Sequence, residues 1–95
     1  MTKKEFKNFV NEALENGAVW YKTNDEELEP IGILYVEDGE LVLNPIEGGE
    51  DYRYEIDEDD IKSMVDEMWQ EQSPKKWVQI DEEEYEEIEE EYFNS

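Results

Sequence analysis

The chain has 95 residues, of which 30 are Asp or Glu and 8 are Lys or Arg, so its formal net charge is −22. It contains no Cys and no His, which excludes disulfides, thiolate chemistry, imidazole catalysis and the usual zinc ligands. A chain this negative repels nucleic acid and anionic membranes, so we expect neither as a direct partner.

Aromatic side chains make up 13% of the residues, and they supply buried area that disordered chains usually lack. The length is that of one domain, so we expect residues 1–95 to fold as a single domain. No apolar run approaches the ~18 residues of a membrane span. Residues 6–14 are too polar for a signal peptide, and together with the missing Cys this predicts a cytoplasmic protein.

The first predicted element is a helix. Thr2 and Glu5 have the spacing of a capping box, and the apolar residues from Phe6 to Leu14 recur at helical intervals. Gly17 suits the left-handed position that follows the last turn of a helix.

Four strands are predicted next, over 18–23, 31–37, 40–44 and 51–56, because β-branched and aromatic residues gather there. Asp38 and Gly39 stand between two apolar runs, which is a strong signal for a tight hairpin. Asp57 is expected to cap a second helix, whose apolar stripe runs from Ile61 to Trp69 and which stops before Pro74. Residues 75–80 fit either a strand or an extended connector.

A third helix is predicted over about 81–93, since Asp81 and Glu84 suggest an N-terminal cap and Tyr85, Ile88 and Tyr92 share one face. Sequential strands joined by short turns favour an antiparallel sheet. The expected fold class is α+β: a meander of about four strands with the N-terminal helix and two C-terminal helices packed on it.

The last predicted helix concentrates the charge. At ~1.5 Å of rise per residue it carries a carboxylate about every 1.8 Å, close to the ~1.7 Å per phosphate charge of duplex DNA. Four like-charge pairs at i, i+4 each cost about 0.2–0.5 kcal/mol, and no Lys or Arg follows Lys76 to relieve them. We infer that the negative field itself is selected; the alternative is an acidic disordered tail. The carboxylates are Asp81, Glu82, Glu83, Glu84, Glu86, Glu87, Glu89, Glu90 and Glu91.

Two other acidic clusters have local explanations, as a polar turn and as a helix start, but with the last helix they are candidates for one extended anionic face. These clusters are Asp25, Glu26 and Glu27, and Asp57, Glu58, Asp59 and Asp60. The second cluster fails as an EF-hand, since Ile61 and Lys62 stand where a ligand and a glycine are needed. We expect no metal site and no cofactor. With thirty acids no carboxylate pair stands out, so we expect no enzyme.

In its small size, its extreme acidity, its lack of Cys and the carboxylate density of residues 81–91, the chain resembles the acidic DNA-mimic inhibitors of phages and mobile elements. These include anti-CRISPR and anti-restriction proteins and the uracil-DNA glycosylase inhibitor. The resemblance is one of charge character and not of an aligned motif. It implies a protein that blocks the basic nucleic-acid-binding surface of a partner, often a host defence nuclease.

Two other functions fit the same composition. An immunity protein that neutralises a basic nuclease toxin would use the same electrostatics, and a toxin gene next door would identify it. An acidic interaction module without an inhibitory role would keep its partner after its charges were neutralised.

Overall fold

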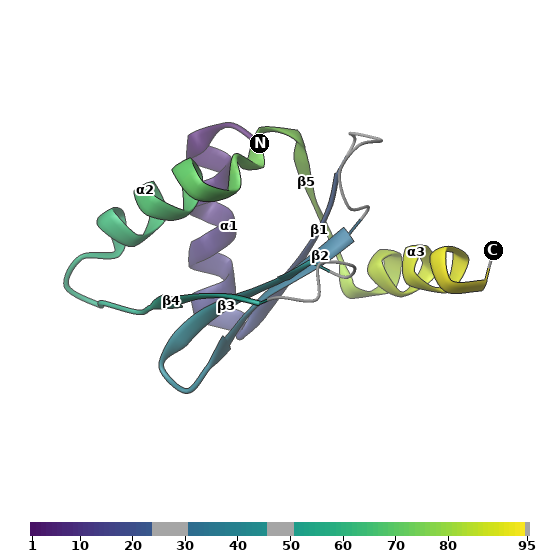
Figure 1. Ribbon diagram of the computed structural model, residues 1–95, viewed down its shortest axis with the longest axis horizontal. Coiled ribbons are helices and arrows are strands. Elements are labelled where there is room, and N and C mark those ends of the chain that lie inside the picture. The colour runs from purple at the N-terminus through teal and green to yellow at the C-terminus, as the bar shows by residue number, and fades with distance from the viewer. Residues whose placement is uncertain (24–30, 46–50, 95) are drawn as a thin grey trace.

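The computed structural model describes residues 1–23, 31–45 and 51–94 (Figure 1). Its fold is α+β, as the sequence predicts. The elements in chain order are α1 (Lys3–Asn16), β1 (Ala18–Thr23), β2 (Ile31–Glu37), β3 (Glu40–Pro45), β4 (Tyr52–Glu55), α2 (Ile61–Gln72), the 3-10 helix η1 (Pro74–Lys76), β5 (Trp77–Ile80) and α3 (Glu82–Asn94).

The sheet is antiparallel, with the order β4-β3-β2-β1-β5. The first four strands form the predicted meander. The segment that the sequence left open between strand and connector is a fifth strand, so the sheet has one strand more than expected. β5 pairs with β1 from Trp20 opposite Ile80 to Thr23 opposite Trp77. This pairing brings the chain back across the sheet before α3 begins.

Local signals set the ends of α1 and the β2–β3 hairpin as predicted. The Thr2 hydroxyl accepts from the Glu5 amide at 3.2 Å, and the Glu5 carboxylate accepts from the Thr2 amide at 2.9 Å. Gly17 ends the helix with φ of 88°. Asp38 and Gly39 have φ of 51° and 76°, which is the left-handed geometry of a tight two-residue hairpin turn.

The cap of α2 is not the residue that the sequence predicts. Asp60 caps the helix through its carboxylate, which accepts from the Ser63 amide at 3.2 Å and from the Ser63 hydroxyl at 2.8 Å. Asp57 instead accepts from the Asp59 amide at 3.0 Å, in a turn that precedes the helix. A run of four acids offers several residues that could cap the helix. Asp60 is the cap because Ser63, at the third helical position, donates two hydrogen bonds to its carboxylate.

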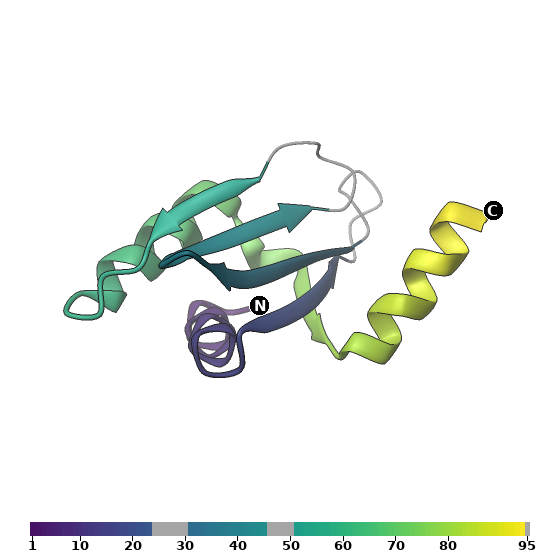
Figure 2. The same ribbon diagram turned by 90° about the horizontal axis from the view of Figure 1, so that it is seen from below.

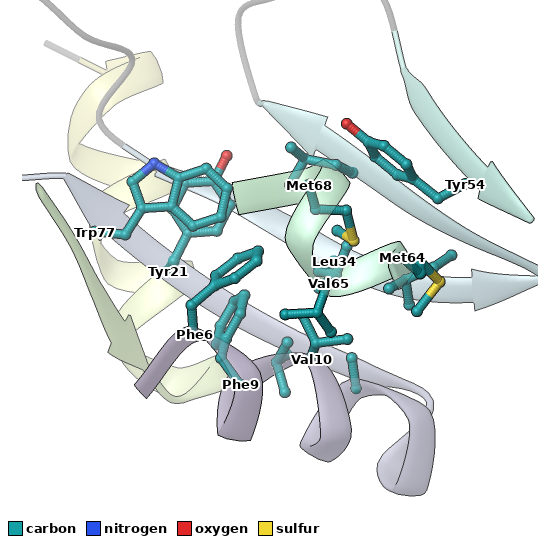
Figure 3. Close-up of a cluster of buried hydrophobic side chains, with 14 residues drawn as sticks. Phe6, Phe9, Val10, Tyr21, Leu34, Tyr54, Met64, Val65, Met68 and Trp77 are labelled. Carbon is teal, nitrogen blue, oxygen red and sulfur yellow. The ribbon is translucent and has the colours of Figure 1, made fainter. Parts of the chain in front are cut away.

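The core lies between the sheet and the helices α1 and α2, which cover one of its faces (Figure 1, Figure 3). Its centre is aromatic. Trp77 stacks on Tyr21 with ring centroids 3.8 Å apart and an interplanar angle of 8°. Phe6 and Phe9 of α1 both meet the Trp77 ring edge-on, at 6.0 and 6.2 Å. These large side chains give a small domain a dense core despite its modest apolar content.

Helix α3 contacts the opposite face of the sheet. In β1 the residues alternate: Val19 and Tyr21 are buried under α1 and α2, whereas Trp20 and Lys22 face the other way and contact α3. Figure 2 shows the helix leaning away from the sheet as it runs toward the C-terminus. Within the described part of the chain, no helix combines the length and apolar character needed to cross a membrane.

Candidate protein-binding surface

The start of α3 is fixed by Asp81, as the sequence predicts. Its carboxylate accepts from the Glu84 amide at 2.8 Å, and its carbonyl accepts from the Tyr85 amide at 3.0 Å. Carboxylates in the first turn lie near the positive end of the helix, which stabilises them. Asp81 and the first-turn residues Glu82 and Glu83 therefore occupy favourable positions, although they repel one another.

Contacts with β1 help to hold the helix against the sheet. The Trp20 and Tyr85 rings lie 6.5 Å apart at 51°, and the Lys22 ammonium pairs with the Glu84 carboxylate at 3.0 Å. Burial against the sheet raises the pKa of the Tyr85 hydroxyl, and the neighbouring Glu89 carboxylate raises it further. Tyr85 and Ile88 are both half-buried, so this part of the predicted apolar stripe faces the sheet, whereas the side chain of Tyr92 lies outside the described part of the structure.

The remaining carboxylates of α3 divide by face. Glu84 and Glu89 are half-buried on the side of the sheet, whereas the others on the helix are exposed. The exposed ones form two rows along the helix, and we call them the outward face: Glu82, Glu86 and Glu90 in one row, and Glu83, Glu87 and Glu91 in the other. Carboxylates within a row are four residues apart, or about 6 Å along the axis.

The outward face is less dense in charge than the sequence count suggests. Six exposed carboxylates over ten residues correspond to about 2.5 Å per charge along the axis. Duplex DNA has one charge per ~1.7 Å and a single strand one per ~3.4 Å. The outward face lies between these values, because two of the nine predicted carboxylates turn toward the sheet and Asp81 caps the helix.

The predicted acidic cluster of residues 57–60 does not share a surface with α3. Residues 57–60 precede α2, at the opposite end of the molecule from α3, and the molecule is 44 Å long (Figure 1). Asp57, Glu58, Asp59 and Asp60 are exposed there. Asp25, Glu26 and Glu27 lie outside the described residues.

The cations gather away from α3. Six of the eight belong to α1, α2 and η1, and Arg53 of β4 lies beside Glu37 and Glu40 at 3.8 and 3.5 Å. Lys22 of β1 is the cation that pairs with α3 in the described ion pairs, through Glu84. The six are Lys3, Lys4, Lys7, Lys62, Lys75 and Lys76. The α3 end of the molecule therefore has an almost unopposed negative charge.

A groove lies at the base of α3, and the sequence did not indicate it. It has a volume of about 490 Å³ and runs between the end of α1, the start of β1 and the start of α3. Trp20 lines it. Trp77 is in the core and Trp69 packs against it, but Trp20 is half-buried on the α3 side of the sheet. The alternation of a strand predicts that Trp20 and Tyr21 lie on opposite faces of the sheet, but not which of the two faces the core.

No cluster of three or more potential metal ligands occurs among the residues that the structure describes. The surface thus offers fixed negative charge, one partly exposed indole ring and a groove, which suit binding by charge complementarity. No family model matches the chain, and neither the curated proteins nor the solved structures contain a match.

Proposed function

We propose that the protein is a DNA-mimic inhibitor that binds the basic nucleic-acid-binding surface of a nuclease, of the kind that defends a host cell against phages or mobile elements. The observation that carries the proposal is the outward face of α3: six exposed carboxylates on a helix that leans out from the domain and contains no Lys or Arg.

The arrangement costs stability, which argues that the charge has a use. The like-charge pairs at i, i+4 along the outward face together cost roughly 1–2 kcal/mol. One or two Lys residues on this solvent-exposed face would relieve the repulsion without disturbing the core. Their absence, in a chain that places six cations on the opposite side, supports a face kept negative for binding.

The geometry suits a groove built for a nucleic-acid backbone. Such grooves bind phosphates with Lys and Arg side chains, and a phosphate-binding surface recognises charge spacing more than base identity. Two rows of carboxylates on one face of a helix offer the same side chains a regularly spaced set of acceptors. Complementary fields of this kind raise association rates toward 10⁸ M⁻¹s⁻¹ at low salt, so the inhibitor would compete well with DNA.

The experiment is a capture from host lysate at about 50 and 500 mM salt, followed by mass spectrometry and by competition with duplex DNA. The test variant replaces five outward-face residues with Gln: Glu83, Glu86, Glu87, Glu90 and Glu91. The control variant removes five exposed carboxylates elsewhere: Glu15, Glu55, Glu58, Asp59 and Glu67, with Asn replacing Asp59. The two variants have the same net charge, so they separate the outward face from the overall acidity.

We expect wild type and the control to capture a basic nuclease at low salt and to release it to duplex DNA, while the test variant loses capture. Equal capture by the test variant would refute mimicry by α3 and indicate an acidic interaction module. Capture that DNA does not displace would also contradict the proposal.

A further inference from the structure

The groove at the base of α3 exists because β5 is short. The pairing of β5 with β1 begins at Trp20 and Ile80, so Ala18 and Val19 have no partner on β5 and both line the groove. Beyond Ile80 the chain turns away into α3. The result is a hollow of about 490 Å³, with the end of α1 on one side and the first turn of α3 on the other.

The lining combines an apolar floor with a negative rim. Trp20 is the half-exposed apolar residue of the lining, with the buried residues Val19 and Ile80 beside it, and none of the described lining residues is basic. The rim has four carboxylates: Glu12 of α1, and Asp81, Glu82 and Glu84 at the start of α3. An anion would be repelled from this groove, and a purely apolar side chain would desolvate the carboxylates without pairing them.

Three of these carboxylates are held in place by neighbours. The side-chain amide of Gln79 donates to one carboxylate oxygen of Glu12 at 2.6 Å, and the backbone amide of Glu84 donates to one carboxylate oxygen of Asp81 at 2.8 Å. The Lys22 ammonium holds one Glu84 oxygen at 3.0 Å. A carboxylate has two oxygens and about four acceptor positions, so each can take a further donor. The rim is thus oriented before any partner arrives, which lowers the entropic cost of binding.

We propose that this groove binds an arginine side chain from the basic partner, as an anchor beside the outward face; the inference rests on the proposed function. A guanidinium group has a flat, weakly hydrated face that stacks on an indole ring and five N–H donors that pair with carboxylates at its edge. Trp20 supplies the ring, and Glu12, Asp81 and Glu82 supply the acceptors. A lysine ammonium has no flat face and presents a compact charge, so it uses the Trp20 wall less well.

The test is an NMR titration of the ¹⁵N-labelled full chain with a hexa-arginine peptide and, separately, a hexa-lysine peptide. The Trp20 indole N–H signal is assigned by its loss in Trp20→Phe. The groove variant is Glu12→Gln/Glu82→Gln. The matched control is Glu15→Gln/Glu67→Gln, which removes two exposed helical carboxylates outside the groove and the outward face.

We expect hexa-arginine to shift the Trp20 indole signal at sub-saturating concentrations and to bind the groove variant about tenfold more weakly, with a less than threefold loss in the control. Hexa-lysine should bind more weakly to wild type and should leave the Trp20 signal nearly unchanged. Equal losses in both variants, or an unshifted Trp20 signal on saturation with hexa-arginine, would overturn the inference.

The proposal of an arginine anchor in the groove and the proposal of DNA mimicry by the outward face can be refuted separately. Nuclease capture that survives in Glu12→Gln/Glu82→Gln but is lost in the five-residue α3 variant would overturn the arginine anchor and support the mimic. A shifted Trp20 signal with hexa-arginine, in a protein that captures no nuclease, would support the groove and overturn the proposed function.

Discussion

Replacing Glu86 with Lys should stabilise α3 while weakening capture of the partner. Glu86 is exposed in the middle of the outward face, with Glu82 one turn before it and Glu90 one turn after it. Each of these i, i+4 pairs now costs about 0.2–0.5 kcal/mol, and a Lys at this position would convert each cost into a gain of similar size. The two pairs together change by about 0.8–2 kcal/mol.

The assay is native-state hydrogen exchange of the α3 amides, because this helix lies apart from the α1–α2 core and its opening can be measured by itself. A change of about 0.8–2 kcal/mol corresponds to roughly 4- to 30-fold slower exchange, since 1.4 kcal/mol is a factor of ten. Glu86→Gln removes only the repulsion and should give about half the free-energy change. Glu58→Lys alters the net charge equally at the far end of the molecule and should leave α3 exchange unchanged.

Raised salt should shrink the difference between Glu86→Lys and wild type, since both effects are electrostatic and exposed. Nuclease capture by Glu86→Lys should fall even as the helix becomes more protected. Faster α3 exchange in Glu86→Lys would refute the reasoning, because it would mean that the carboxylates do not repel one another across the turns. Slower exchange with undiminished capture would separate the outward face from binding.

Three other measurements test the account. Raising salt from about 50 to 500 mM should raise Tm, by about 4–8 °C for each kcal/mol of repulsion that is screened, while it weakens capture; a salt-independent Tm would contradict the repulsion. Burial, followed by the hydrogen bond to Glu71 at 2.7 Å, raises the pKa of Tyr54 to about 12, above the ~10 of the unfolded chain. The stabilising effect of the neutral Tyr54 hydroxyl is therefore complete below pH 10 and is lost as pH rises through 12. Urea titrations between these pH values should show a smaller loss of unfolding free energy in Tyr54→Phe than in wild type. Tyr52→Phe, at an exposed position, is the control and should lose as much as wild type. Gly32→Ala would place a methyl group against the Tyr21 ring, and we expect a loss of about 1–3 kcal/mol in unfolding free energy; an unchanged urea midpoint would contradict that contact.

Local features of the fold were predictable because they depend on a few neighbouring residues. The Thr2–Glu5 capping box and the turn at Asp38 and Gly39 each follow from backbone chemistry within four residues. The residue that caps α2 was not predictable, because Asp57 and Asp60 are chemically equivalent in a run of acids. Only the hydrogen bonds that Ser63 adds distinguish Asp60.

The position of α3 could not be predicted from its own sequence. Its stripe of Tyr85 and Ile88 shows that one face docks, but not on what. The docking surface is set by β5, whose pairing with β1 is a long-range contact that short strands signal weakly. The environment of Trp20 could not be predicted for the same reason: both faces of β1 carry aromatic residues, so the alternation alone does not show which face α1 and α2 cover.

The separation of cations from the outward face makes the molecule an electric dipole as well as an anion. Its negative pole lies at α3, and its less negative pole lies over α1, α2 and η1. The electric field of a basic partner would orient the molecule during diffusional encounter, so more encounters would begin with α3 facing the partner. Moving two carboxylates from α3 to α1 would then slow association at constant net charge, an effect that equilibrium affinity alone would not reveal.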